Sequence, residues 1–480
     1  MDITKGIDIQ PKFVPPLDPG FKPASLINRR FRELAAKNGV PLRLSLERAD
    51  GSISTFDTIA FAPGDPRFEL NLPYAERIVK FLLWQRGGWK VTVGGPAAIG
   101  EYIKQCYQVG GTREFDSNFM GGVYEHPFTV VVTEADKVPA EKETSSPLGR
   151  HMDGCRIGFD LGGSDRKFAA VQDGKVLVAD EIKWDPYHQP DPEYHRAGIL
   201  DCIQQAAKHL PRIDAIGGSA AGVYVNNRVR VASLFRGVMN ASKELFDAKV
   251  VEMFIEIGKE LGVPLEVVND GEVTALAGSM SLGENPVLGI AMGTSLAAGY
   301  VNKDGNITGW LNELAFTPID YRPAVTPHDP IDYSVDGPID EWSGDTGCGV
   351  QYFSQQGVNR LALQSGIRFD ADMKLPDRLV RVQEMMAAGD PTAAKLYESI
   401  GIFLGYAMAH YADFYELNHT LILGRVTTGK GGDIIVSKAT EVLNTEFEEL
   451  SGRVKIATPD EKARRVGQSI AAASLPEIKK

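Results

Sequence analysis

The segment 160–167, DLGGSDRK, joins a carboxylate to a turn that backbone amides can line. Gly162 and Gly163 would let the chain come close to a phosphate and point its amides at it. Asp160, at the end of an apolar run, could hold Mg²⁺ through water molecules. Because Gly-Gly-Ser turns are common, an ordinary hairpin turn is the alternative interpretation.

A second small turn, Gly293-Thr294-Ser295, also follows an apolar run. The Thr294 hydroxyl can donate to the β- or γ-phosphate of a nucleotide. Two such turns facing each other across a cleft would clamp the phosphates from both lobes. The pair of turns therefore indicates a nucleotide site more strongly than either turn alone.

Between the two turns, the chain carries Asn269-Asp270 at the end of another apolar run. A carboxylate at that point can take the proton from an attacking hydroxyl, and the neighbouring amide can hold an adjacent hydroxyl of the same molecule. The alternative is a helix cap, which Asn and Asp favour for local reasons. Asp270 could serve both purposes.

Short apolar runs and helical stretches must position these three segments. The run 156–163 predicts a buried strand, and 168–182 predicts a hairpin around Asp173-Gly174. The remaining elements expected here are helices at 194–210, 242–261 and 391–416 and strands at 213–217, 265–268, 287–291, 296–301 and 420–423. Each glycine-rich turn thus opens a hairpin, and the two halves share one plan.

The front of the chain has a different pattern. Residues 1–30 are rich in proline and lack periodicity, so they predict an arm or a loose tail. A hairpin is expected at 41–61, followed by a helix at 75–84, a strand at 89–93 and a helix at 99–107. The polar stretch 135–154 predicts a linker.

The whole chain has 480 residues, of which 43% are hydrophobic and 24% charged, with a net charge of −12. This length predicts more than one domain, and no long basic run provides the footprint that nucleic acid requires. No apolar stretch is long enough to predict a membrane span. The four cysteines lack metal or disulfide spacing, so reduced thiols and a cytoplasmic location are expected.

From residue 156 to about 475 the chain resembles the ROK family of sugar kinases and related repressors. The likeness is carried, in order, by DLGGSDRK, GGSAAGVYVNNRV, VVNDGEVTALAG, AMGTSLAAGYV, GWLNELAFTP, SGDTGCGVQYFS, GDPTAAKLYESIGIFLG and ILGRV. The resemblance implies an α/β, two-lobed actin-like ATPase fold of the ribonuclease H-like type. It also implies ATP and Mg²⁺ as cofactors, a sugar as the substrate, and a homodimer.

The resemblance assigns roles to individual residues. Asp270 matches the catalytic base, and Asp160 would help to position Mg²⁺. The residues that would bind the sugar are Asn269, Glu313, Gly222 and Asn226. The residues that would bind the nucleotide are Asp160, Gly162, Gly163, Ser164, Lys167, Gly293, Thr294, Gly424 and Arg425.

Three departures from the family pattern are visible. The family's zinc ligands, three cysteines and one histidine, correspond here to Glu341, Ser343, Cys348 and Phe316. A single thiol cannot build a tetrahedral site, so we expect no zinc and expect packing around Phe316 to stabilise this loop. A glutamate that touches the sugar in the family is Val350 here, which predicts a favoured sugar other than glucose or a replacement contact. Arg425 stands where the family has glycines, which leaves the nucleotide preference open.

These observations predict three segments: an accessory α/β domain of unknown role at 1–150, and the two lobes at 151–285 and 286–480, with the last helix returning to the first lobe. Because the front segment lacks a basic helix-turn-helix pattern, the repressor branch is rejected. The function expected is ATP-dependent phosphorylation of a sugar hydroxyl, a hexose or a derivative, with Asp270 as general base. The alternatives are a sugar-binding sensor or assembly protein without turnover, and an actin-like ATPase or a carboxylate kinase.

Overall fold

The computed structural model describes residues 2–143, 148–458 and 461–478, and these form two compact units. The first unit contains the described residues of 1–144, 291–297 and 310–458. The second contains the described residues of 145–290, 298–309 and 459–480. The front 144 residues therefore share a unit with 310–458. Residues 144–147, inside the predicted linker, lie outside the described residues.

The second unit is built on a five-stranded sheet with the order β11-β8-β5-β6-β7. Antiparallel β6 and β7 lie on one side of the central strand β5, and parallel β8 and β11 lie on the other. The strands are β5 Cys155–Leu161, β6 Asp165–Gln172, β7 Lys175–Lys183, β8 Ala215–Ala220 and β11 Leu265–Asn269, with a small hairpin of β9 Tyr224–Val225 and β10 Arg228–Val229. The predicted hairpin turn at Asp173-Gly174 is confirmed, with φ of 47° and 79°.

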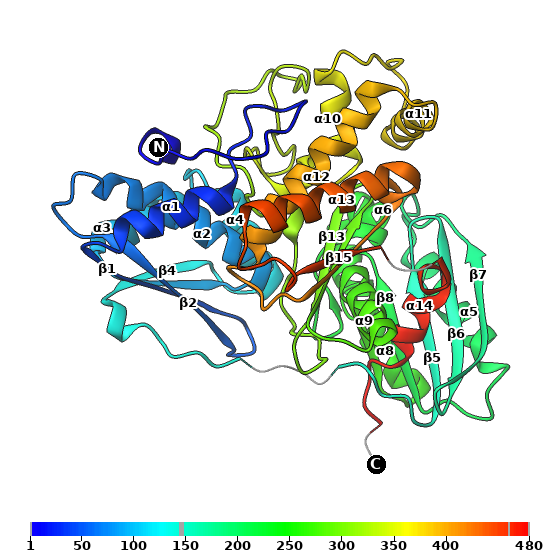
Figure 1. The fold of residues 1–480 in the computed structure, drawn as a ribbon. Coiled ribbons are helices and arrows are strands. Elements are labelled where there is room, and N and C mark those ends of the chain that lie inside the picture. Colours follow the sequence, from blue (N-terminus) through cyan, green and yellow to red (C-terminus); the bar gives the residue numbers. More distant parts are fainter. Residues whose placement is uncertain (1, 144–147, 459–460, 479–480) are drawn as a thin grey trace. The chain divides into compact units, whose positions relative to one another are not determined.

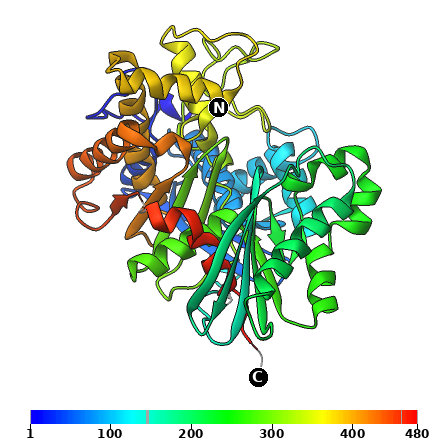
Figure 2. The ribbon, with the colours of Figure 1, turned by 90° about the vertical axis from the view of Figure 1, so that its right-hand side faces the viewer.

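Helices cover both faces of this sheet. They are α5 Pro192–Ala207, α6 Arg236–Ala241, α7 Lys243–Lys249, α8 Met253–Leu261, α9 Asp270–Leu282 and α14 Glu461–Ala473. The single helix predicted at 242–261 is therefore wrong, since Val250–Glu252 separates α7 from α8. Figure 2 shows α14, in red, on one side of the sheet and the green helices that precede β11 on the other.

The last helix packs unusually close to the sheet. A Cβ atom at Gly217 in β8 would lie 1.7 Å from the carbonyl oxygen of Ala472, and one at Gly158 in β5 would lie 1.7 Å from that of Ser469. Only glycine at these two strand positions allows α14 to approach so far. The final helix of the chain thus completes the second unit.

The front part of the first unit is a four-stranded sheet with the order β2-β1-β3-β4 (Figure 1). Its strands are β1 Gly39–Glu47, β2 Ile53–Phe61, β3 Lys90–Gly94 and β4 Thr129–Thr133, and its helices are α1 Ala24–Ala35, α2 Asn71–Arg86, α3 Ala97–Tyr107 and α4 Glu114–Tyr124. Every residue of α2 is buried. The predicted hairpin at 41–61 and the helices near 75–84 and 99–107 are confirmed, each with longer bounds.

The prediction that residues 1–30 lack regular structure is wrong in part, because α1 begins at Ala24. Its Ile27, Phe31 and Ala35 recur every four residues and are buried, a helical period that the proline-rich run before it obscures. The residues before α1 form an arm held by hydrogen bonds to distant helices. Leu17 N donates to Ser399 Oγ, for example, over 3.2 Å.

The remaining part of the first unit is mainly helical. It contains α10 Gln355–Gln364, α11 Leu375–Ala387, α12 Pro391–Tyr411 and α13 Gly429–Glu446, with the strands β14 His419–Leu423 and β15 Lys455–Ala457. Another four-stranded sheet has the order β13-β12-β14-β15, where β12 is Val287–Met292 and β13 is Leu296–Val301. Residues 287–290 and 298–301 of these two strands belong to the second unit. Among the described residues, none of the helices is both long and apolar enough to cross a membrane.

Candidate active site

Asn269 and Asp270 lie where strand β11 passes into helix α9. The Asn269 side chain caps this helix, because its Oδ1 accepts a hydrogen bond from Gly271 N over 2.8 Å. Its Nδ2 donates to the carbonyl oxygen of Gly222 over 2.7 Å. The helix-cap interpretation thus holds for Asn269, and the same side chain fixes the segment of Gly222. Asp270 Oδ1 also accepts from Gly271 N, over 3.0 Å, which leaves Oδ2 for other chemistry.

The Asp270 carboxyl group has an unusual affinity for protons. Burial, and next to it the negative charge of Asp160, raise the pKa of Asp270 to about 6. A carboxylate with this pKa is mostly ionised at neutral pH and is a stronger base than an ordinary aspartate. Perturbed carboxylates of this kind gather at functional sites.

Asp160 belongs to the same edge of the sheet. It lies opposite Ser219 in the parallel pairing of β5 with β8, and its Oδ1 accepts from Ser219 Oγ over 2.7 Å. Its Oδ2 accepts from Lys167 Nζ over 3.2 Å, and this ammonium lies 3.3 Å from Asp165 Oδ1. Although burial lowers the pKa of Lys167, these two carboxylates raise it above its usual value. Lys167 is therefore a charged group at the predicted phosphate turn.

The turn 162–165 is held rigidly by its surroundings. Gly162 N donates to Asp165 O over 2.9 Å, and Trp184 Nε1 donates to Gly162 O over 2.7 Å. A Cβ atom at Gly163 would come within 2.4 Å of the Tyr187 ring, so a larger residue here would have to displace that ring. Ser164 Oγ donates to Asp165 Oδ2 over 3.0 Å. A preorganised turn of this kind suits a bound anion.

The donors near Asp160 fit Mg²⁺, which prefers one or two carboxylates together with phosphate and water oxygens. Asp160 and Asp165 supply carboxylates, and Ser219 supplies a hydroxyl. Within the described part of the chain, no group of three His, Cys, Asp or Glu side chains could hold a metal ion by itself. A magnesium ion here would therefore depend on the nucleotide for most of its ligands.

In the first unit, Gly293 and Thr294 form the predicted second turn. Gly293 N donates to Ser295 O, and Gln355 N at the start of α10 donates to Gly293 O, both over 2.9 Å. Thr294 is exposed and lines a cavity of about 990 Å³ together with basic side chains of α11 and the residue before it. Asp329, Asp332 and Glu341 also line this cavity, so its charge is mixed rather than basic.

Gly424 and Arg425 follow strand β14 in the same unit. Gly424 has a φ of 98°, and a Cβ atom there would lie 2.4 Å from Met292 O, so only glycine fits. The Arg425 carbonyl accepts from Gln383 Nε2 over 2.8 Å, which ties this loop to α11. The Arg425 side chain is exposed.

Glu313 is half-buried and precedes a single 3₁₀ turn, Leu314–Phe316. Its backbone N donates to Trp84 O over 2.9 Å, and the N of Asn312 donates to Gln85 O over 2.8 Å. Asn312 has a φ of 51°, a left-handed conformation that turns the chain just before Glu313. The front segment thus holds the backbone of this predicted sugar ligand.

The four residues at the family's zinc positions do not converge on one point. Phe316 stacks on Trp84 with a centroid distance of 4.1 Å, and Glu341 accepts from the Tyr333 hydroxyl over 2.6 Å. Ser343 Oγ donates to Asp340 over 2.5 Å, and Cys348 Sγ lies 3.8 Å from Asp345. Burial raises the pKa of the Cys348 thiol well above its usual value, so this sulfur stays protonated. Packing around Phe316 is present, as predicted.

The structure groups some of the predicted residues and leaves others apart. In the second unit Asn269, Asp270 and Gly222 form one group, and Asp160 with Lys167 and the turn 162–164 forms another close to it. Asn226 is exposed at the tip of the β9–β10 hairpin, with a φ of 52°, and its neighbour Asn227 is the residue that bonds to β11. Glu313, Gly293, Thr294, Gly424 and Arg425 all lie in the first unit.

Sequence reasoning missed two side chains near these groups. Ser219 could have been found, because the pairing of two apolar runs that both end at the same edge places it beside Asp160. Tyr224 is partly buried and lies near Asp270, whose negative charge contributes, after desolvation, to raising the pKa of the phenol. No sequence signal points to Tyr224, since the contact depends on how the short hairpin folds back.

No family model and no curated protein matches this chain. Among solved structures, a ROK hexokinase from Thermus thermophilus is similar with a TM-score of 0.50 and 17% identity, covering 66% of this chain and 97% of that one. A ROK family transcriptional regulator, a homologue of the E. coli MLC protein, has a TM-score of 0.50 and 19% identity, covering 70% and 80%. The chain therefore has the fold of ROK proteins, an α/β fold shared by a kinase and a regulator.

Proposed function

We propose that this protein transfers the γ-phosphoryl group of ATP to a hydroxyl of a hexose or a hexose derivative. The observation that carries the proposal is the position of the Asp270 carboxylate beside the capped and oriented Asn269, where burial and the charge of Asp160 raise its pKa to about 6. A base that is ionised at neutral pH but still basic is what a sugar hydroxyl requires. The fold shared with a ROK hexokinase supports the same class of reaction.

In the proposed reaction Asp270 Oδ2 accepts the proton of the sugar hydroxyl. The hydroxyl oxygen forms a bond to the γ-phosphorus while the bond from that phosphorus to the β–γ bridging oxygen breaks, and ADP leaves. Asn269 and Glu313 bind neighbouring hydroxyls, with Gly222 and Asn226 as further candidates for the sugar. The contribution of these residues is mainly positioning.

The phosphates are held by the backbone of Gly162, Gly163 and Ser164 with Lys167, and by Gly293 and Thr294. Gly424 and Arg425 contact the nucleoside. Mg²⁺, when bound, neutralises phosphate charge, and Asp160 with the nearby Ser219 hydroxyl supplies oxygen donors that fit it. Lys167 adds a fixed positive charge at the first turn.

A screen of the purified protein with Mg·ATP against hexoses, amino sugars, N-acetyl sugars and polyols tests the proposal. We expect ADP release that depends on one sugar and that Asp270→Asn lowers by roughly 10²–10⁴-fold with the fold retained. Asp180→Asn, at an exposed carboxylate of β7 in the same unit, is the matched control and should leave the rate unchanged. Wild-type turnover by the Asp270→Asn variant would show that Asp270 is not the base.

The second candidate is a sugar-binding sensor without turnover. Val350 favours it, because this buried apolar side chain stands where the family resemblance expects a carboxylate for the sugar. The same screen separates the two candidates. Thermal stabilisation by a sugar, without ADP release at any Mg·ATP concentration, would support the sensor and reject the kinase.

A further inference from the structure

Helix α2 ends in carbonyl groups that are used outside the helix. The last carbonyls of a helix have no partner within it and must bond elsewhere. Leu83 O accepts from Gly87 N, while Trp84 O and Gln85 O accept from the backbone N of Glu313 and of Asn312, over 2.9 and 2.8 Å. The C-terminal end of α2 therefore fixes the backbone of Glu313 directly.

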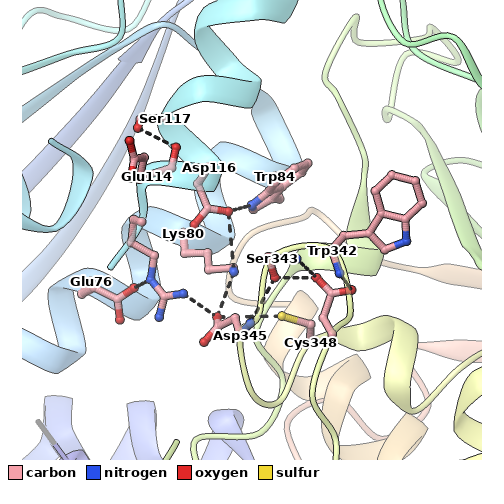
Figure 3. Close-up of polar contacts among 12 residues, drawn as sticks. Glu76, Lys80, Trp84, Glu114, Asp116, Ser117, Trp342, Ser343, Asp345 and Cys348 are labelled. Carbon is pink, nitrogen blue, oxygen red and sulfur yellow. Dashed lines mark hydrogen bonds and ion pairs between the residues drawn. The ribbon is translucent and has the colours of Figure 1, made fainter. Parts of the chain in front are cut away.

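The middle of the same helix reaches a second loop, 340–348, through charged side chains (Figure 3). Lys80 Nζ lies 2.8 Å from Asp345 Oδ2, and Arg77 Nη1 lies 3.0 Å from the same oxygen. Arg113, just before α4, lies 2.9 Å from it. Three cations from the front segment thus converge on one carboxylate of the loop.

Two further carboxylates complete this group, which we call the Asp345 network. Glu76 pairs with Arg77 over 2.7 Å and also contacts Arg113, and Asp116 lies 3.6 Å from Lys80 while accepting from Trp84 Nε1 over 2.6 Å. Three cations therefore face three carboxylates. Lys80 is 0% exposed, and a buried ammonium is tolerated only when it is paired in this way.

The Asp345 network is buried but remains ionised at its centre. Although burial alone raises the pKa of Asp345, the charges of Arg77 and Lys80 lower it below its usual value. Burial alone lowers the pKa of Lys80, and Asp116 and Asp345 raise it above its usual value. Removing one member would leave an uncompensated buried charge, so the loop position depends on the complete set.

The loop carrying Asp345 is joined to the segment that follows Glu313. Ile319 N donates to Gly347 O over 2.9 Å, and Gly349 N donates to Thr317 O over 3.0 Å. Pro318 and Cys348 form an antiparallel bridge between these contacts. Because these two segments are paired, holding Asp345 in place also holds the residues next to Glu313 in place.

From these contacts we propose that α2, a helix of the front segment, positions Glu313, and that Lys80 is a positioning residue acting through Asp345. One end of the helix holds Glu313 by its backbone, and the middle holds the loop that supports it. The consequence for sugar recognition rests on the proposed function of Glu313 as a sugar ligand. The positioning itself can be measured without any sugar.

Hydrogen exchange followed by mass spectrometry, on the full-length chain without ligand, tests the positioning. In Lys80→Met, peptides spanning 311–319 and 345–352 should exchange about tenfold faster or more, while peptides of the second unit are unchanged. Asn71→Ala is the matched control, since Asn71 starts the same helix and its buried side chain bonds to the Phe61 backbone, over 2.8 and 2.9 Å. It should loosen the front sheet and leave 311–319 protected.

A milder variant keeps the test decisive if Lys80→Met fails to fold. Trp84→Phe, within α2 itself, shrinks the ring that stacks on Phe316 with a centroid distance of 4.1 Å, and it should speed exchange in 311–319. Unchanged exchange at 311–319 in a folded Lys80→Met or in Trp84→Phe, or equal loosening by Asn71→Ala, would overturn the proposal.

Kinetics provide a measurement that would not change if Lys80 had only a structural role. With the sugar that the wild type phosphorylates in the screen, Lys80→Met and Trp84→Phe should raise the sugar KM about fivefold or more and change kcat less than about twofold. Loss of kcat at constant KM would overturn Lys80 as a positioning residue. Were no sugar phosphorylated at all, the proposed function would fail, and the exchange experiment would still decide whether α2 positions Glu313.

Discussion

Burial and the neighbouring negative charge of Asp160 both raise the pKa of the Asp270 carboxyl group. With a pKa of about 6, Asp270 loses its role as a base when it is protonated below that pH. We expect kcat/KM for the sugar to fall about tenfold per pH unit below pH 6 and to be level between pH 7 and 8. Ser219→Ala, which frees Asp160 from its hydroxyl donor, should shift this midpoint, whereas Asp180→Asn should not. A pH-independent rate between pH 5 and 8 would contradict the assignment.

The same shift makes a prediction about stability. The folded pKa of Asp270, about 6, is above the ordinary aspartate value of 3.8, so folding favours the protonated form. This stabilisation is complete below pH 3.8 and is lost as the pH rises through 6. At pH 8 the ionised group therefore costs roughly 2–3 kcal/mol, and Asp270→Asn should raise the free energy of unfolding by about that amount.

Denaturant unfolding of wild type and Asp270→Asn at pH 5 and pH 8 measures this difference, which should be larger at pH 8. Asp201→Asn is a control of opposite sign. Although burial raises its pKa, hydrogen bonds from Gln205 and Arg166 hold the pKa of Asp201 below its usual value, so this change should destabilise the protein at pH 8. Destabilisation by Asp270→Asn at pH 8 would contradict the direction of the Asp270 shift.

The residues whose grouping could be predicted from sequence are those whose neighbours are local. Asn269, Asp270 and Gly271 interact across three positions, so a strand-to-helix junction is enough to bring them together. Ser219 and Tyr224 come from other elements, and their contacts depend on register and on a hairpin. The hydrogen bond from Asn312 to Gln85 links positions more than two hundred residues apart, and no sequence pattern predicts it.

Among the elements, helix α14 depends most strictly on residue size. The Cβ of an alanine at Gly217 would lie 1.7 Å from Ala472 O, which is backbone and cannot move aside alone. Gly217→Ala should therefore lower the free energy of unfolding by roughly 3 kcal/mol or more. Gly122→Ala in helix α4 is the matched control, because no atom lies within 4 Å of its added Cβ, and it should be neutral or stabilise by about 0.5–1 kcal/mol. Equal effects of the two substitutions in urea unfolding would contradict this packing.

The loop 340–348 leads to a prediction about metal. Cys348 has a protonated thiol beside Asp345, and Lys80 places a positive charge at the centre of the group. A metal cation would be repelled there, and a single cysteine offers too few ligands. We expect elemental analysis to find no stoichiometric zinc and EDTA to leave the Tm unchanged. One zinc per chain, or a fall in Tm with EDTA that zinc restores, would contradict this.

Sequence patterns predict some helices and strands of this protein better than others. Strand Leu296–Val301 was predicted with the observed bounds, since a short apolar run between turns has few other solutions. Helix α1 was missed because prolines precede it, and α4 because its sequence, EFDSNFMGGVY, contains two glycines that lower helix propensity. Their helical state is set by packing against the rest of the first unit, which a local pattern does not contain.

At the scale of the whole molecule, the front 144 residues share a compact unit with 310–458 through contacts between residues far apart in the chain. Asp18 accepts from Arg322 and from Arg360, each over 2.8 Å, and Arg360 is fully buried. Although burial raises its pKa, these two guanidiniums lower the pKa of the Asp18 carboxyl below its usual value. The change in composition near residue 150 predicts a separate accessory segment. Composition alone does not show which distant residues pack together.

A chain that begins at residue 148 tests whether the front segment can be separated from the rest. It would leave Arg360 buried without Asp18, and it would expose Phe316 and the backbone of Glu313, which Trp84 and α2 cover. We expect residues 310–458 of this fragment to exchange amide hydrogens as an unfolded chain does and to aggregate, while peptides of the second unit stay protected. Adding residues 1–147 as a separate chain should restore protection to 310–458, because the missing contacts are noncovalent. A soluble fragment with native protection at 311–319 would mean that the front segment is an independent domain, and that α2 is not needed to hold Glu313.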